Sequence, residues 1–169
     1  YSVSLGDSAS SGQNSVSIGY SAGGTSQQDY STAVGFLSGA FNQGFSSVSI
    51  GNQSGYTDQG TGAVAIGSYA GNNNQGINSV AIGNGAAGYT GSLAKQNQGN
   101  NSVAIGFQSG NSGQGTYCIA IGSNSAFTAQ GNNAVAIGRE SGMYSQGLNA
   151  VALGSYAGTT NQAAYSICL

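Results

Sequence analysis

Small and aliphatic residues alternate in one short phrase that recurs along the whole chain and closes on glycine. In Ser79-Val80-Ala81-Ile82-Gly83 the aliphatic side chains stand three and one residues before the glycine, and small residues stand four and two before it. An alternation of period two predicts a β-strand. Neither set of positions is charged, so we expect both faces of the strand to be buried. The closing glycines are Gly6, Gly19, Gly35, Gly51, Gly67, Gly83, Gly106, Gly122, Gly138 and Gly154.

The phrase returns at a nearly constant interval. Successive closing glycines are 16 residues apart, except for a step of 13 to Gly19 and a step of 23 to Gly106. A fixed period of this length is typical of one structural unit stacked on copies of itself. We therefore predict an all-β fold, a parallel β-solenoid of about ten 16-residue coils. Residues 1–169 would form one repeat domain, with an irregular loop inserted at about 88–97.

The two strand faces receive different roles in this prediction. We expect the aliphatic side chains to fill the coil and the small ones to face a neighbouring chain, which indicates an oligomer. The predicted core residues are Val48, Ile50, Val64, Ile66, Val80, Ile82, Val103, Ile105, Ile119, Ile121, Val135, Ile137, Val151 and Leu153.

A glutamine follows the strand in every repeat, eight residues after the closing glycine in the regular ones. Its amide carries both donor and acceptor atoms. Amides stacked at the strand spacing can bond to the coil above and below, as in cross-β assemblies. A plain polar turn residue is the alternative. After Gln13 in the first repeat, the predicted ladder consists of Gln27, Gln43, Gln59, Gln75, Gln98, Gln114, Gln130, Gln146 and Gln162.

Composition excludes several classes of function. The chain has 31 Gly, no His, and 4% charged residues with a net charge of −2. Two cations, Lys95 and Arg139, cannot neutralise a phosphate backbone, so no nucleic-acid partner is expected. No apolar run approaches the roughly 20 residues that cross a membrane. The carboxylates Asp7, Asp29, Asp58 and Glu140 fall in separate coils, so we expect no enzyme, no metal and no cofactor.

The phrases at 78–83, 101–106 and 149–154 resemble the head repeats of YadA-type trimeric autotransporter adhesins. That resemblance implies a left-handed β-roll, a homotrimer and binding to host surfaces. The 16-residue period and the Gln-Gly element depart from the family pattern, and similar repeats occur in viral and phage surface fibres. Two other solenoid families fit less well. The calcium-binding nonapeptide roll needs an Asp in each turn, and the hexapeptide helix needs an aliphatic residue every six residues, and this sequence has neither pattern.

Two readings of function remain open. The first is an adhesive rod at an extracellular, cell or virion surface, which contacts a host protein or glycan through repeated weak contacts. The second is a shaft or filament subunit without a ligand. An ice-binding role is disfavoured because the exposed columns are mixed. Candidate ligand contacts are Tyr30, Tyr69, Tyr117, Tyr156 and Lys95.

Two further features bear on assembly. Cys118 and Cys168 occupy small-residue positions, and we interpret them as replacements for Ala or Ser, with an interchain disulfide as the alternative. Both chain ends interrupt the phrase, so we expect a segment of a longer protein.

Overall fold

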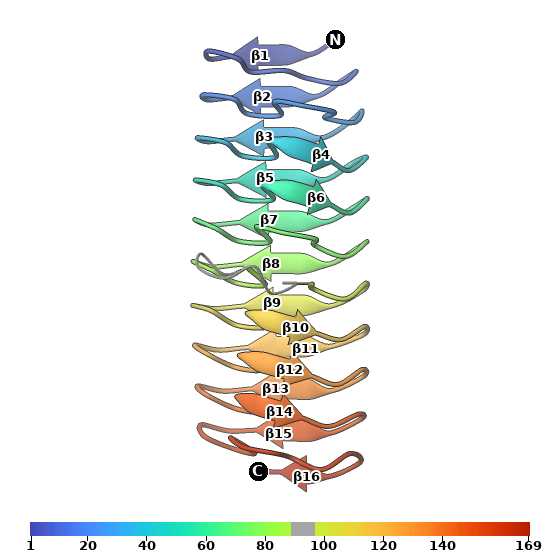
Figure 1. Cartoon of the computed structure of the whole chain (residues 1–169), viewed down its shortest axis with the longest axis vertical. Coiled ribbons are helices and arrows are strands. Elements are labelled where there is room, and N and C mark those ends of the chain that lie inside the picture. The colour runs from blue at the N-terminus through green and yellow to red at the C-terminus, as the bar shows by residue number, and fades with distance from the viewer. Residues whose placement is uncertain (89–96) are drawn as a thin grey trace.

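The chain winds into a stack of coils that place short strands directly above one another, as the computed structural model shows (Figure 1). The structure describes residues 1–88 and 97–169. The loop expected at about 88–97, including Lys95, falls mainly on residues 89–96 and lies outside the described residues. In the described parts of the chain, no helix combines the length and apolar character that crossing a bilayer requires.

Within residues 1–88 and 97–169, eleven strands form one parallel sheet, the main sheet, in which neighbours follow chain order. Val64 pairs with Val48 on one side and with Val80 on the other, so equivalent positions of successive repeats are stacked. The register continues across the longest step, where Val80 pairs with Val103. The predicted parallel β-solenoid is therefore confirmed. The strands of the main sheet are β1 (Val3–Leu5), β2 (Val16–Ile18), β3 (Thr32–Val34), β5 (Val48–Ile50), β7 (Val64–Ile66), β8 (Val80–Ile82), β9 (Val103–Ile105), β11 (Ile119–Ile121), β13 (Val135–Ile137), β15 (Val151–Leu153) and β16 (Ile167–Cys168).

Shorter sheets lie on the opposite side of the coil, and each of their strands ends on a glutamine (Figure 1). One sheet pairs β4 (Phe41–Gln43) with β6 (Thr57–Gln59). The other contains β10 (Ser112–Gln114), β12 (Thr128–Gln130) and β14 (Tyr144–Gln146). Isolated bridges from Gln75 to Gln98 and from Gln98 to Gln114 continue the same alignment between them.

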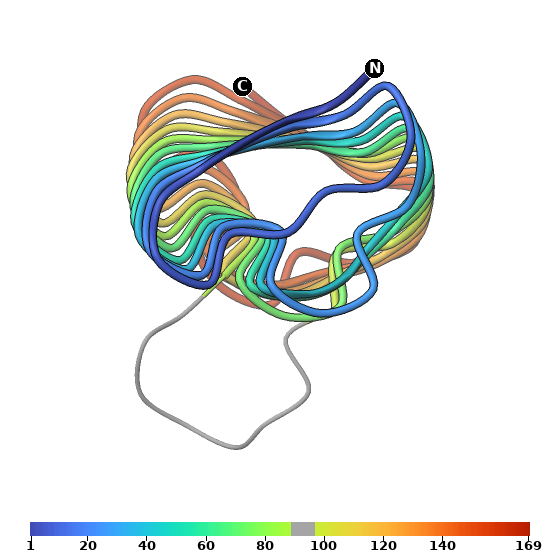
Figure 2. The same ribbon diagram turned by 90° about the horizontal axis from the view of Figure 1, so that it is seen from above.

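The coil is left-handed. Seen from the N-terminal end, the chain runs anticlockwise as it recedes along the stack, and each coil is slightly rotated relative to the last (Figure 2). The handedness agrees with what the family resemblance implied.

The closing glycine is required where two coils approach closely. Gly67 has a φ of +121°, and a Cβ at this position would lie 2.7 Å from the carbonyl oxygen of Gly83 in the next coil. An L side chain would therefore be strained and would also collide with the neighbouring backbone. These two constraints explain why glycine ends every strand phrase.

The assignment of the two strand faces was wrong: the small residues fill the coil and the aliphatic residues point outward. Ala65 in β7 has an exposed fraction of 0%, whereas Ile50 in β5 is 38% exposed. The predicted core residues from Val48 to Leu153 are all half-buried or exposed in this chain. Alternation shows that two faces differ, but it does not show which face turns inward.

The width of the coil explains this reversal. A Cβ on Gly71, across the interior, would lie only 3.2 Å from the Cβ of Ala65. A methyl group or a hydroxyl fits that gap, and a Val or Ile side chain does not. The interior is accordingly lined by Ala, Ser, Cys118 and the long glutamine side chains.

Candidate functional site

The outward side chains of the main sheet form a continuous apolar strip, here called the aliphatic face. Neighbouring strands align Val on Val and Ile on Ile, as in Val64↔Val80 and Ile66↔Ile82. Soluble monomers rarely expose large contiguous apolar patches. The face consists of Val3, Leu5, Val16, Ile18, Thr32, Val34, Val48, Ile50, Val64, Ile66, Val80, Ile82, Val103, Ile105, Ile119, Ile121, Val135, Ile137, Val151, Leu153, Ile167 and Leu169.

The predicted glutamine ladder occupies the interior of the coil, where each amide braces one wall against the other. The Nε2 of Gln75 donates to the carbonyl oxygen of Val64 at 2.7 Å, across the coil. All nine glutamines of the predicted ladder make the equivalent bond to the first residue of a main-sheet strand, at distances between 2.7 and 3.4 Å. Gln13 differs, because its side chain in the short first repeat is exposed.

Direct amide-to-amide bonds join only some neighbouring coils. They run from Gln27 to Gln43, from Gln59 to Gln75, from Gln130 to Gln146 and from Gln146 to Gln162, at 3.0 to 3.1 Å. In the middle of the stack the Oε1 atoms of Gln98, Gln114 and Gln130 are buried without a hydrogen-bond partner. The glutamines are thus first a brace within each coil and only in part a ladder between coils.

Four of the tyrosines proposed as ligand contacts lie at two corners of the coil, at opposite ends of the main-sheet strands. Tyr30 and Tyr117 precede their strands and are 56% and 63% exposed. Tyr69 and Tyr156 follow theirs, and Tyr69 is half-buried. The structure therefore does not gather the four rings into one patch. All four have a positive φ, between 57° and 65°.

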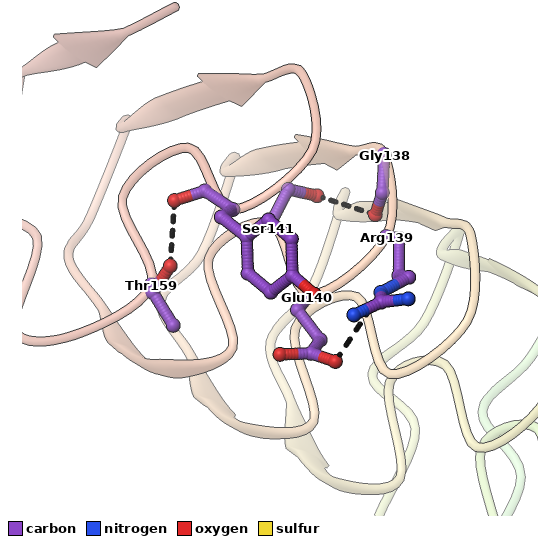
Figure 3. Close-up of polar contacts among 6 residues, drawn as sticks. Gly138, Arg139, Glu140, Ser141 and Thr159 are labelled. Carbon is purple, nitrogen blue, oxygen red and sulfur yellow. Dashed lines mark hydrogen bonds and ion pairs between the residues drawn. The ribbon is translucent and has the colours of Figure 1, made fainter.

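The described cation Arg139 belongs to a small polar cluster at the corner after β13 (Figure 3). Its Nε lies 3.4 Å from Oε1 of Glu140, and its guanidinium lies 4.8 Å from the centre of the Tyr156 ring. The Ser141 hydroxyl donates to the Gly138 carbonyl oxygen at 3.0 Å and closes the turn. An ion pair this exposed contributes little to stability. Its charge is balanced locally, so it does not create an anion site.

The cysteines are not placed to join chains through the small-residue face. Cys118 is fully buried inside its own coil, where its Sγ lies 3.0 Å from the Gly131 carbonyl oxygen. Burial raises the pKa of the Cys118 thiol, although backbone hydrogen bonds from Ala134, Asn133 and Gly115 act in the opposite direction. Both cysteines are free. The alternative of an interchain disulfide through Cys118 is contradicted, because the small-residue face points inward.

Sequence reasoning missed a group of aromatic side chains in the first few coils. Tyr20 and Phe36 stack with centroids 5.4 Å apart, and Phe41 meets Tyr56 edge-on at 5.2 Å. The shared column of Tyr20 and Phe36 was visible in the sequence. The contact between Phe41 and Tyr56 was not visible as a shared column, because these residues occupy neighbouring columns of adjacent coils, where the Phe41 N–H donates to the Tyr56 carbonyl oxygen at 2.9 Å.

In the part of the chain that the structure describes, no three His, Cys, Asp or Glu side chains gather into a group that could hold a metal ion. The surfaces described above offer apolar area, aromatic rings and hydroxyl groups.

Comparison with known proteins identifies the repeat. The family model of the YadA head domain repeat, which spans two copies, matches residues 10–38, 75–87, 98–109 and 114–141. Neither a search of curated proteins nor a search of solved structures found a match. Heads of this family are trimeric modules of surface-exposed adhesins. The matched segments follow the coils of the parallel solenoid, and in these segments the chain is similar to the head repeat of the YadA family.

Proposed function

We propose that this chain is a non-enzymatic rod segment of a surface adhesin, in which three copies pack together and display their outer corners to a host surface. The aliphatic face is the observation that carries the proposal. A single chain leaves two columns of Val, Ile and Leu at least partly exposed along its whole height. Burial of apolar area stabilises by about 25 cal/mol per Å². A narrow coil with Ala and Ser inside obtains little of that stabilisation from its own interior.

A homotrimer follows from the same face together with the family. Copies related by rotation can bring identical strips together around one axis. The small sheets with β4, β6, β10, β12 and β14 lie on the opposite side of the coil, and they stay available to a partner (Figures 1 and 2). Repeated weak contacts on a rigid trimer raise the apparent affinity without any single strong site.

The tyrosines at the coil corners support a recognition role. Tyr30 and Tyr117 hold a left-handed backbone conformation at a corner where Asn78 and Asn149 stand in other repeats. Asn tolerates this conformation better than an aromatic residue does. An exposed tyrosine in a strained backbone conformation lowers stability, so its presence there indicates a functional role. A host protein or a host glycan suits exposed tyrosines, which offer an apolar ring and a polar tip.

Adhesion assays with matched charge variants test this proposal. Ile66→Lys places a charge on the aliphatic face, and Thr160→Lys places the same charge on an exposed position of the other side. We expect Ile66→Lys to abolish the trimer and with it the binding of the segment to host cells or matrix, and Thr160→Lys to retain both. Equal adhesion by a monomeric Ile66→Lys variant would contradict the proposal.

A ligand-free shaft of a cell-surface or virion fibre is the second candidate, and one observation favours it. The glutamine brace recurs in every coil from Gln27 to Gln162, which provides a uniform rod without reference to any ligand. An intact trimer that binds no host cell, matrix protein or glycan would favour the shaft over the adhesin.

A further inference from the structure

A shallow cleft lies near the N-terminal end of the rod. It is lined by residues of the turns that follow β2 and β3 and by Phe41 of strand β4. Leu37 and Phe41 form its apolar wall, and Ser21 and Thr25 provide hydroxyl groups. Its volume is about 180 Å³, smaller than a typical small-molecule site, so it can receive one part of a larger ligand. Because Phe41 belongs to β4, the cleft borders the side of the coil opposite the main sheet (Figure 1). Packing of the aliphatic face therefore leaves it open.

One aromatic ring, that of Phe41, lines the cleft, and other aromatic residues adjoin the lining residues in the chain or contact Phe41. Phe36 directly precedes Leu37 and stacks on Tyr20 with an interplanar angle of 15°. Phe41 meets Tyr56 with an interplanar angle of 88°. Tyr20, Phe36 and Phe41 are 50%, 46% and 41% exposed. Because Tyr20 and Phe36 stack on one another, a ligand with an apolar face could use only an outer face of that pair, or the ring of Phe41.

Two hydroxyls of the cleft have no hydrogen-bond partner in the described residues, whereas the main chain of Thr25 is already paired and the Ser8 hydroxyl donates to Asp7 Oδ1 at 3.5 Å. Within the described part of the chain, the hydroxyls of Ser21 and Thr25 make no hydrogen bond. The Thr25 N–H donates to the Ala40 carbonyl oxygen at 2.8 Å, and the Thr25 carbonyl oxygen accepts from the Asn42 N–H at 2.9 Å. An extended peptide would need such main-chain groups to add as a strand. A ligand that presents hydroxyl groups needs only the side chains.

Charge selects the kind of ligand further. No lining residue of the cleft is charged. The Asp7 carboxylate adjoins it, since its Oδ1 accepts a 3.5 Å hydrogen bond from the hydroxyl of the lining residue Ser8. A carboxylate at the border disfavours sulfated, sialylated or phosphorylated ligands, and the two cations of the chain lie at positions 95 and 139.

We propose that this cleft and the aromatic residues beside it bind a neutral glycan, with a pyranose ring stacked on Phe41 or on an outer face of the Tyr20–Phe36 pair. One face of a pyranose ring presents C–H groups to an aromatic ring, and its hydroxyls match groups that both donate and accept, as Ser21 and Thr25 do. The inference deepens the proposed adhesive function and rests on it, because it names the ligand class of one segment of the rod.

The test uses the full chain as its natural assembly on an array of neutral hexose and N-acetylhexosamine oligosaccharides, with sialylated and sulfated oligosaccharides alongside. The best neutral oligosaccharide is then titrated calorimetrically against Phe36→Ala, Phe41→Ala and Thr25→Val. Phe107→Ala is the matched control, because Phe107 occupies the same repeat position as Phe36, is 50% exposed and lies far along the stack. We expect at least tenfold weaker binding for each Phe variant at the cleft, about threefold weaker binding for Thr25→Val, and no change for Phe107→Ala.

Three results would overturn the inference: no binding of any neutral oligosaccharide by the intact assembly, preferred binding of the charged ones, or an equal loss for Phe107→Ala. Melting temperatures within a few degrees of the parent chain show that the half-exposed side chains were removed without unfolding. Cell adhesion separates this inference from the function on which it rests. If Phe41→Ala retains adhesion and Ile66→Lys loses it, the glycan site is contradicted and the adhesive function is still supported.

Discussion

The Ser49 hydroxyl donates a 2.7 Å hydrogen bond to Oε1 of Gln59 across the interior of the coil. Ser17 makes the same bond to Gln27 at 2.6 Å. Both serines face a glycine, because a Cβ on Gly55 or Gly23 would overlap the hydroxyl. Where alanine replaces that glycine, as at Ala87 and Ala126, the strand also carries alanine, at Ala81 and Ala120. The interior is therefore matched residue by residue.

This pairing predicts how single hydroxyls change stability. Ser49→Ala leaves the Gln59 acceptor buried without a partner, so we expect a loss of about 1–3 kcal/mol in the free energy of unfolding. Ala104→Ser faces Gly110 and lies ten residues before the unpartnered Gln114, so we expect a gain of about 1 kcal/mol. Denaturant midpoints measure both changes.

Ala120→Ser is the control for that gain. It offers the same hydroxyl to the unpartnered Gln130, but Ala126 occupies the space that the hydroxyl needs. We expect no stabilisation from it. A gain equal to that of Ala104→Ser would show that the match between strand and turn is irrelevant.

A buried charge tests whether the glutamines are internal braces. The Gln43 side chain is fully buried, donates to the Thr32 carbonyl oxygen at 2.8 Å and accepts from Gln27 at 3.0 Å. In Gln43→Glu, ionisation would place a carboxylate against that carbonyl, so burial and repulsion should raise the pKa of the new side chain. We expect a loss of at least about 2 kcal/mol at neutral pH.

The sign of the pH dependence follows from that raised pKa. Between the unfolded pKa of about 4.3 and the raised folded pKa, the folded state binds more protons, so the variant becomes more stable as pH falls. Gln28→Glu, on an exposed side chain, should change stability by less than about 0.5 kcal/mol and lack this dependence. Urea titrations at several pH values compare the two, and identical pH profiles would rule out the internal brace.

Tyrosine at the left-handed corner should reduce stability and contribute to binding. In Tyr117→Asn, a residue that accepts the φ of 57° replaces an aromatic ring that is 63% exposed. We expect the free energy of unfolding to rise by up to about 1 kcal/mol while binding to host cells falls. Thermal unfolding and adhesion of the same preparation provide the two readouts. A variant that loses stability without changing adhesion would remove the functional reason given for this tyrosine.

The buried thiol predicts a difference in cysteine reactivity. Burial raises the pKa of Cys118, so its thiol should remain protonated and unlabelled in the folded chain, while the half-buried Cys168 reacts first. Above the free-thiol pKa of about 8.5 the unfolded chain loses its proton before the folded chain does, so stability should fall as pH rises. Ser102 occupies the same repeat position as Cys118. Cys118→Ser should therefore be tolerated and should abolish the loss of stability at high pH. Simultaneous labelling of both thiols at neutral pH would contradict the burial.

The sequence predicted the period, the strands, their parallel stacking and the positions of the glutamines, because these depend on local alternation and on a fixed repeat length. The sequence did not show which face of each main-sheet strand turns toward the interior of the coil. Which of Val64 and Ala65 turns inward depends on the width of the coil, which is set by Gly71 across the interior rather than by the strand itself. The contact between Phe41 and Tyr56 escaped because the two residues stand in neighbouring columns rather than in one shared column of the repeat.

Sedimentation equilibrium of the unmodified chain at micromolar concentration tests most directly whether the outward Val and Ile columns join copies of the protein. A species of three times the 16.5 kDa chain mass is expected, without a detectable smaller form. A stable single-chain species at the same concentration would mean that water covers those columns, and the account of this rod as a trimeric adhesin segment would be wrong.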